Sequence, residues 1–154
     1  NSTNQFNCTR CAAGSFSSIN GLSFCERCQP GGYAANASST GCLPCDPGTH
    51  INSTGATGCM SCSMGTYSSY PGSIDCSWCP IGTVQPELRS VGCIECMAGT
   101  YMNITGQSTC MGCPAGHYAS GQGSSLCLAC ESGKRSRFFN GSTDCVTCTA
   151  GTFT

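Results

Sequence analysis

Nine C-x-x-C pairs recur along the chain at a nearly constant interval, and this spacing limits the possible folds more than any other feature. The interval is 17 residues, apart from one of 18 whose extra residue lies in 134–139. A fixed period is typical of tandem repeats, in which each unit packs on its neighbours. The sequence therefore predicts nine repeats over residues 1–154. We number these units one to nine by their first cysteines, which are Cys8, Cys25, Cys42, Cys59, Cys76, Cys93, Cys110, Cys127 and Cys145.

The two ends of the chain favour an array that continues beyond this segment. Seven residues precede Cys8 and six follow Cys148, and together they equal the 13 residues that usually separate successive pairs. We therefore expect the segment to continue into further repeats or into a second subunit.

Glycine and aromatic residues hold fixed places in the unit. A glycine follows the first cysteine by six residues in all nine units, and an aromatic residue follows two positions later in six of them. Pro30-Gly31 suits a type II turn, because glycine tolerates the positive φ that this turn needs. No apolar period of about 3.6 residues favours a helix. The prediction is a small disulfide-rich fold, mostly irregular with short β-hairpins, arranged as a linear rod with a thin core of disulfides and single aromatics.

The composition supports a cross-linked scaffold rather than one large apolar core. The 154 residues include 18 cysteines, but only six basic and seven acidic residues. Such a cysteine content marks a chain in which cross-links replace burial. The net charge of −1 gives no reason to expect a nucleic-acid partner. No apolar run approaches the roughly 18 residues that cross a bilayer, so we expect no membrane span in this segment.

Paired C-x-x-C motifs also suit zinc sites, so the compartment has to be argued separately. Six N-x-S/T sequons favour passage through an oxidising compartment, and hence disulfides and a secreted or cell-surface protein. Counting free thiols would test the zinc alternative. The sequons lie at Asn1, Asn7, Asn36, Asn52, Asn103 and Asn140. Asn1, Asn52 and Asn103 share one phase of the repeat, three units apart. If three repeats make about one superhelical turn, we expect their glycans to line one side.

The connectivity of the cysteines cannot be proved from the sequence, and other pairings stay open. The periodic solution joins the second cysteine of each pair to the first of the next. Each such bridge would close a loop of about 15 residues, which contributes roughly 3 kcal/mol in the chain-entropy model. Cys8 and Cys148 are then left for bridges between segments. The eight pairs are Cys11–Cys25, Cys28–Cys42, Cys45–Cys59, Cys62–Cys76, Cys79–Cys93, Cys96–Cys110, Cys113–Cys127 and Cys130–Cys145.

No group of residues predicts catalysis, so we expect no enzyme, no metal and no cofactor beyond covalent N-glycans. His50 stands at the aromatic position, where packing explains it, and His117 is expected in a solvated loop. The acids are isolated, without a carboxylate pair for acid–base work. One basic cluster is a candidate partner contact, and exposed apolar residues are candidate contacts with neighbouring chains. The basic residues are Lys134, Arg135 and Arg137, and the apolar ones are Leu22, Phe24, Leu88, Phe138 and Phe139.

The segment Cys59–Cys79, CMSCSMGTYSSYPGSIDCSWC, resembles the ephrin-receptor-like cysteine-rich repeat. It is also similar to the first module of tumour-necrosis-factor-receptor cysteine-rich domains. The resemblance covers the whole chain, and it supports the periodic bridges, because that receptor module closes the same kind of loop. In receptors, such modules form rods that hold or present a ligand. In protist surface proteins, long arrays of them occur in stalks, coats and flagellar hairs.

Two functions follow as expectations. The first is a structural extracellular glycoprotein, a subunit of a stalk, coat or mastigoneme-like filament that associates with itself or with other filament chains. The alternative is a receptor ectodomain that binds a protein ligand. The receptor module normally alternates with a second, differently bridged module, which is not seen here, and this favours the structural function. With a rise on the order of 10 Å per repeat, nine units would span about 90 Å.

Overall fold

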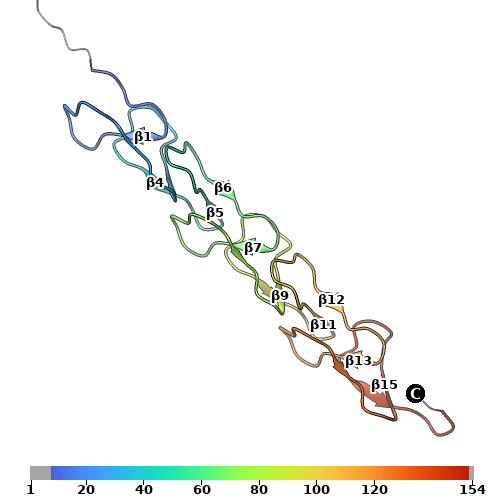
Figure 1. Ribbon diagram of the computed structural model, residues 1–154. Coiled ribbons are helices and arrows are strands. Elements are labelled where there is room, and N and C mark those ends of the chain that lie inside the picture. The colour runs from blue at the N-terminus through green and yellow to red at the C-terminus, as the bar shows by residue number, and fades with distance from the viewer. Residues whose placement is uncertain (1–7, 153–154) are drawn as a thin grey trace, which may run out of the picture.

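The computed structural model describes residues 8–152, which form a long thin rod (Figure 1). Sixteen strands in these residues pair into eight separate two-stranded antiparallel sheets, without a helix. The strands are β1 (Ser15–Phe16), β2 (Glu26–Arg27), β3 (Gly32–Tyr33), β4 (Leu43–Pro44), β5 (Thr49–His50), β6 (Met60–Ser61), β7 (Thr66–Tyr67), β8 (Ser77–Trp78), β9 (Thr83–Val84), β10 (Ile94–Glu95), β11 (Thr100–Tyr101), β12 (Met111–Gly112), β13 (His117–Tyr118), β14 (Leu128–Ala129), β15 (Lys134–Ser136) and β16 (Cys145–Thr147). The predicted fold class is therefore confirmed.

Each hairpin begins at the glycine that the repeat requires. In the second unit, the amide of Gly32 donates to the carbonyl oxygen of Gln29 at 3.0 Å, which closes a turn over Pro30 and Gly31. Gly31 has a φ of 86°, which an L side chain disfavours. Strand β3 follows at once and pairs with β4, the two residues between the cysteines of the next pair. The second strand of each hairpin thus lies inside the next C-x-x-C motif.

Burial along the rod follows the disulfides, as predicted, but not the aromatic residues. The second cysteine of six consecutive pairs is at most 1% exposed, whereas aromatic residues such as Tyr33 and Tyr67 are only half-buried. The residue after the aromatic position fills the core instead. This buried position holds Ala34, Ile51, Ser68, Gln85, Met102 and Ala119. The prediction of single aromatics in the core was wrong, because the residue after the aromatic position is buried while the aromatic residue itself stays half-buried.

The arrangement recurs after every third unit. Strands β1, β7 and β13 begin at Ser15, Thr66 and His117, at intervals of 51 residues, and they occupy equivalent places along the rod (Figure 1). The pairs β5 and β11, and β6 and β12, are related in the same way. Three units therefore make about one turn of the array, which agrees with the phase of the sequons.

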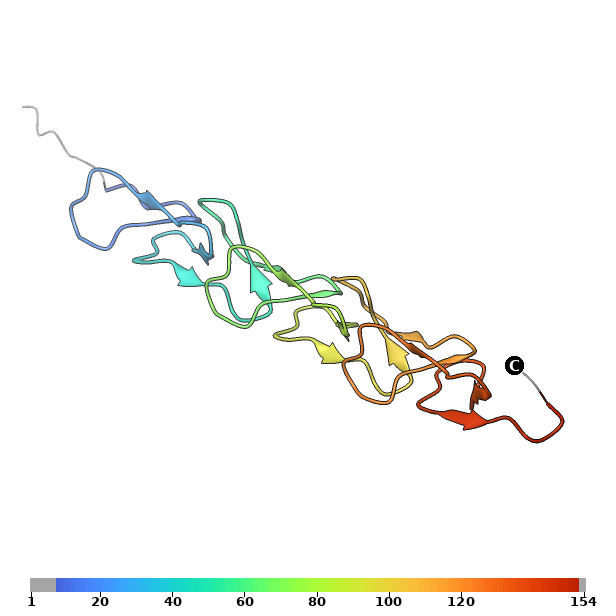
Figure 2. The same cartoon turned by 60° about the horizontal axis from the view of Figure 1, so that its bottom comes forward.

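This recurrence sorts the hairpin loops into three rows that run along the rod. Row 1 contains loops 17–24, 68–75 and 119–126. Row 2 contains 34–41, 85–92 and 137–144, and row 3 contains 51–58 and 102–109. In both views the loops of row 1 project from one long side, and those of row 3 from the other (Figures 1 and 2). Loops of the same row are therefore stacked above one another on a common face.

Within residues 8–152 there is no helix long and apolar enough to cross a lipid bilayer.

Candidate functional site

The most regular feature of the molecule is the junction between consecutive units, which repeats the same three backbone hydrogen bonds. Between the second and third units, the amide of Gly31 donates to the carbonyl oxygen of Ile51 at 2.7 Å. The amide of Ala34 donates to Ala56 at 3.0 Å, and that of Gly55 donates back to Cys28 at 2.7 Å. Corresponding bonds join every pair of units from the first to the seventh. Backbone hydrogen bonding therefore runs along the rod from unit to unit.

A second contact reaches past the nearest neighbour. A methyl group placed on Gly31 would overlap the carbonyl oxygen of Gly72, two units further along the chain. The same close approach occurs at the equivalent glycines of five other units, which are Gly14, Gly48, Gly65, Gly82 and Gly99. Each of the first six units is therefore in contact with the next unit and with the one after it. The expectation that each repeat touches mainly its nearest neighbour was too simple.

Disulfides form the covalent part of the same axis. The eight bridges are the periodic pairs, Cys11–Cys25 through Cys130–Cys145, each with a Cα–Cα distance of 5.7 or 5.8 Å. Cys8 and Cys148 are free thiols, the first exposed and the second half-buried. Because every cysteine from Cys11 to Cys145 is bridged, the zinc alternative is not compatible with this structure.

The eighth unit departs from the pattern at one bond. Its bridge spans 15 residues rather than 14, and its strands β15 and β16 have three residues each. Here the amide of Gly116 donates to the hydroxyl oxygen of Ser136 at 3.0 Å, where other junctions use a backbone carbonyl. The other two bonds are kept, from Ala119 to Ser142 and from Gly141 to Cys113, both at 3.0 Å.

The basic cluster of the eighth unit is largely neutralised by acids of the same unit. Lys134 Nζ lies 2.7 Å from a carboxylate oxygen of Glu131. Two guanidinium nitrogens of Arg137, Nε and Nη2, donate to the carboxylate of Asp144, at 3.1 and 3.0 Å. Arg135 has no carboxylate partner among the described residues. The hydrogen bond to Lys134 lowers the pKa of Glu131, and the same bond raises the pKa of Lys134. The cluster therefore offers little unpaired positive charge to a partner.

Neither histidine lies in a reactive arrangement. His50 Nδ1 lies 3.2 Å from the carbonyl oxygen of Ile74 in the next unit, as suits a packing residue at the aromatic position. His117 was expected in a loop, but the structure places it half-buried in strand β13, with Nδ1 3.2 Å from the carbonyl oxygen of Ala115. In residues 8–152 no three His, Cys, Asp or Glu residues gather as a metal site would require.

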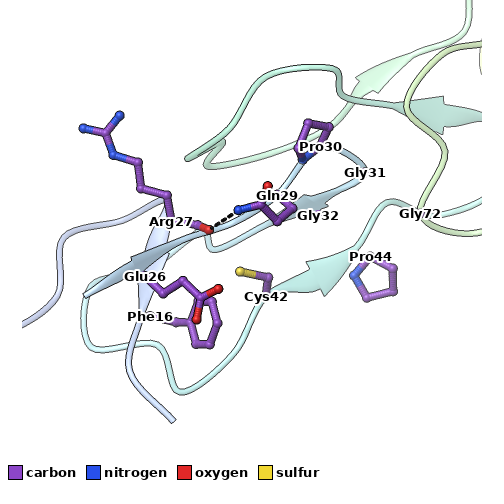
Figure 3. Close-up of a pocket in the computed structure, with 10 residues that line it drawn as sticks. All are labelled: Phe16, Glu26, Arg27, Gln29, Pro30, Gly31, Gly32, Cys42, Pro44 and Gly72. Carbon is purple, nitrogen blue, oxygen red and sulfur yellow. Dashed lines mark hydrogen bonds between the residues drawn. The ribbon is translucent and has the colours of Figure 1, made fainter. Parts of the chain in front are cut away.

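Two open hollows stand out on the described surface. The larger, of about 1110 Å³, lies at the first unit between residues 8–11, loop 17–24 and residues 38–40. The other, of about 370 Å³, is shallow and lies where hairpins of the first four units meet (Figure 3). Its only acidic side chain is Glu26, which lies beside the ring of Phe16. The rest of the lining comes from glycines and prolines together with Arg27, Gln29 and the bridged Cys42. No second titrating acid or nucleophile lines it. The hollow therefore offers no catalytic arrangement and is best described as the gap between stacked hairpins.

The sequons within the described residues lie on exposed loops of two rows. Asn52 and Asn103 belong to row 3, and Asn36 and Asn140 lie in row 2. All four asparagines are exposed, and the side-chain amide of Asn140 also lies against the backbone of Gly112. Asn1 and Asn7 lie outside the described residues. Leu22, Phe24, Leu88, Phe138 and Phe139, expected at the surface, are also exposed.

One comparison with known proteins gives a match. The model of the family described as tyrosine-protein kinase ephrin type A/B receptor-like matches residues 65–101 and 99–144, which together make up more than half of the chain. No curated protein matches the sequence.

Proposed function

The chain belongs to the ephrin-receptor-like cysteine-rich repeat family, and from this premise we propose that it is a structural rod of an extracellular stalk, coat or filament. The family module is extracellular and cysteine-rich, and eight disulfides require an oxidising compartment. The N-glycans expected at Asn36, Asn52, Asn103 and Asn140 would keep the rod hydrated. The proposed role is mechanical rather than catalytic.

One observation supports this proposal above the others. The backbone hydrogen bonds repeat from the first unit to the seventh, the disulfides from Cys11 to Cys145, and the contacts to the second neighbour at six consecutive turn glycines, from Gly14 to Gly99. A solenoid whose units all make the same contacts transmits force along one axis and can be extended by adding units. A receptor ectodomain needs a distinct place for its ligand, and the two hollows of the described residues are open gaps beside hairpin loops rather than enclosed pockets.

Small-angle X-ray scattering of the oxidised chain tests the rod directly. A globular protein of this length has a radius of gyration of about 15 Å. A stiff rod of about 90 Å has one near 26 Å, because nine units each rise on the order of 10 Å. We expect the larger value, and a loss of the rod profile when the disulfides are reduced. A compact particle would contradict the proposal.

Electron microscopy of the native material tests the assembly. We expect filaments or stalks in which the rod is a repeating element. Isolated short rods that are recovered only in complex with a soluble protein ligand would support a receptor instead.

A further inference from the structure

The three rows of loops differ in what they carry. Row 2 has sequons at Asn36 and Asn140, and row 3 has them at Asn52 and Asn103. Row 1 has none in any of its three loops, 17–24, 68–75 and 119–126. Because three units make about one turn, the rows face about a third of a turn apart. One long face of the rod would therefore stay free of N-glycans while the other two carry them.

The bare face is also apolar and nearly uncharged. Phe24 is 67% exposed and Tyr70 is 77% exposed, although large aromatic side chains are usually buried. Four aliphatic side chains of the same row are exposed as well, and Asp75 is the one charged residue in its loops. Row 2 also exposes apolar residues, but among charges and beside its sequons. The exposed aliphatic residues of row 1 are Ile19, Leu22, Ile74 and Leu126.

The size of this face matches a specific protein interface. Full burial of an aromatic side chain covers about 150–250 Å², and that of an aliphatic one roughly 60–120 Å². Scaled by exposure, the six side chains offer about 500 Å² of apolar area. Since a typical interface is about 57% non-polar, the whole contact would cover about 850 Å² per partner. A standard interface buries about 800 Å² per partner.

We propose that row 1 is a lateral interface at which two copies of this chain pair side by side. The proposal rests on the proposed rod. The charged groups at this face are Asp75 and Glu95, whose carboxylate lies beside Gly123, so the contact must leave both at its solvated rim, because burying an unpaired charge would be costly. The apolar loops also recur every 51 residues along the rod, and a second copy presents the same spacing. Glycans on rows 2 and 3 would restrict pairing to this face.

The repeat allows a matched test, because single substitutions can place a new sequon at the same phase of adjacent units. Pro71→Asn creates N-G-S on row 1, and Leu88→Asn creates N-R-S on row 2. Both residues are exposed. The two variants should therefore gain a similar glycan at a similar loop, on different faces of the rod. Mass spectrometry checks that each new site is occupied.

Sedimentation velocity over a concentration series then measures pairing of the glycosylated chains. We expect the wild-type chain and Leu88→Asn to dimerise, and Pro71→Asn to raise the dissociation constant at least tenfold. A monomeric wild-type chain, including one held monomeric by a different partner, would overturn the proposal. So would a dimer that only Leu88→Asn disrupts. Scattering from the same samples separates the two ideas, because a monomer that remains a rod refutes only the pairing.

Discussion

From the first unit to the seventh, every junction uses the same backbone atoms, whereas the junction between the seventh and eighth units substitutes a side chain for one of them. The eighth unit has one residue more between Gly133 and Gly141 than the regular units have between the same two positions, yet Gly141 and Ser142 return to the usual bonds with the preceding unit. The extra length is taken up locally, where Ser142 Oγ bonds both the amide and the carbonyl oxygen of Phe138.

This difference between the two regions shows which residues of the repeat fix the register of one unit on the next. The register depends on the cysteine pair and the turn glycine, which are kept in both regions, and on a second position with positive φ, usually a glycine such as Gly55 or Gly141 but Ser38 and Arg89 in two units. The loop between them can change length, provided that a hydroxyl replaces a lost backbone acceptor. Loops are therefore the part of this repeat in which surface properties such as glycosylation or lateral contacts can vary without disturbing the rod.

Removing a bridge from the regular region should have the largest effect. We expect the double variant Cys62→Ala, Cys76→Ala to lose about 3 kcal/mol locally from loop entropy, plus the packing of a sulfur that is fully buried. Hydrogen exchange at the amide of Gly65 should then quicken at least 100-fold. The matched variant of the eighth unit, Cys130→Ala, Cys145→Ala, should lose less, because Cys130 is only half-buried. Equal losses would mean that sulfur burial contributes nothing.

The turn glycines allow a sharper comparison between an interior and a late junction. Gly65 and Gly116 have φ values of 78° and 76°, so alanine at either costs about 1–2 kcal/mol. Only at Gly65 would the new methyl group also overlap a carbonyl oxygen, that of Gly106; at Gly116 nothing described lies within 4 Å. Thermal unfolding should show that Gly65→Ala is clearly more destabilising. A similar shift for both variants would refute the contact with the second neighbour.

The hydrogen bond from the Gly116 amide to the Ser136 hydroxyl can be removed by a single substitution. Ser136→Ala deletes the hydroxyl that accepts from the Gly116 amide, and we expect a loss of about 1 kcal/mol. Exchange should quicken at the Gly116 amide, while the amide of Gly99 in the regular region stays protected. Ser132→Ala is the control, because Ser132 is exposed. No change at Gly116 would show that water replaces the hydroxyl without cost.

A small gain in folding stability is expected at Ser38, where a unit of the regular region lacks the usual glycine. Ser38 stands at the position of the second glycine and takes a φ of 64°. Ser38→Gly should stabilise the chain by about 0.5–1 kcal/mol, because the left-handed conformation costs serine more than the added chain entropy of glycine. The substitution also destroys the sequon of Asn36, so both chains should carry Asn36→Gln. A loss of stability in chemical denaturation would show that the serine backbone is unstrained.

The smallest effect concerns the ion pair of Lys134 and Glu131, which is exposed. The pKa of Glu131 is lowered by Lys134, so any stabilisation is present above the pKa of an unfolded glutamate. It is lost as the pH falls through the lowered value in the folded chain. In an NMR titration, Lys134→Met should move the midpoint of Glu131 upward, with no measurable change in melting temperature. An unchanged midpoint would exclude the pair in solution.

The hairpins and the position of the extra residue could be predicted from the spacing. The bridges could be predicted as the periodic solution among pairings that stayed open, with support from the family resemblance. The buried position after the aromatic residue could not be predicted, since Ala34, Ile51, Ser68 and Gln85 share no side-chain property that marks them. What they share is a place at the junction with the preceding unit, which only the stacking of units determines. The contact between Gly31 and Gly72 was missed for a similar reason, because it depends on the rotation between units. The aromatic residues misled the prediction, since they recur regularly but are only half-buried.

The pairing of the cysteines also decides how the rod responds to cleavage. Each bridge from Cys11 to Cys145 closes its own loop, so a protease that cuts within a loop leaves both sides joined through sulfur. Between Cys11 and Cys145, only the two residues that separate consecutive bridges, such as Glu26–Arg27, lie outside a disulfide-closed loop. A cut there would divide the chain, but those residues are held in hairpin strands. The rod is in this respect a ladder polymer, in which breaking one peptide bond seldom divides the molecule.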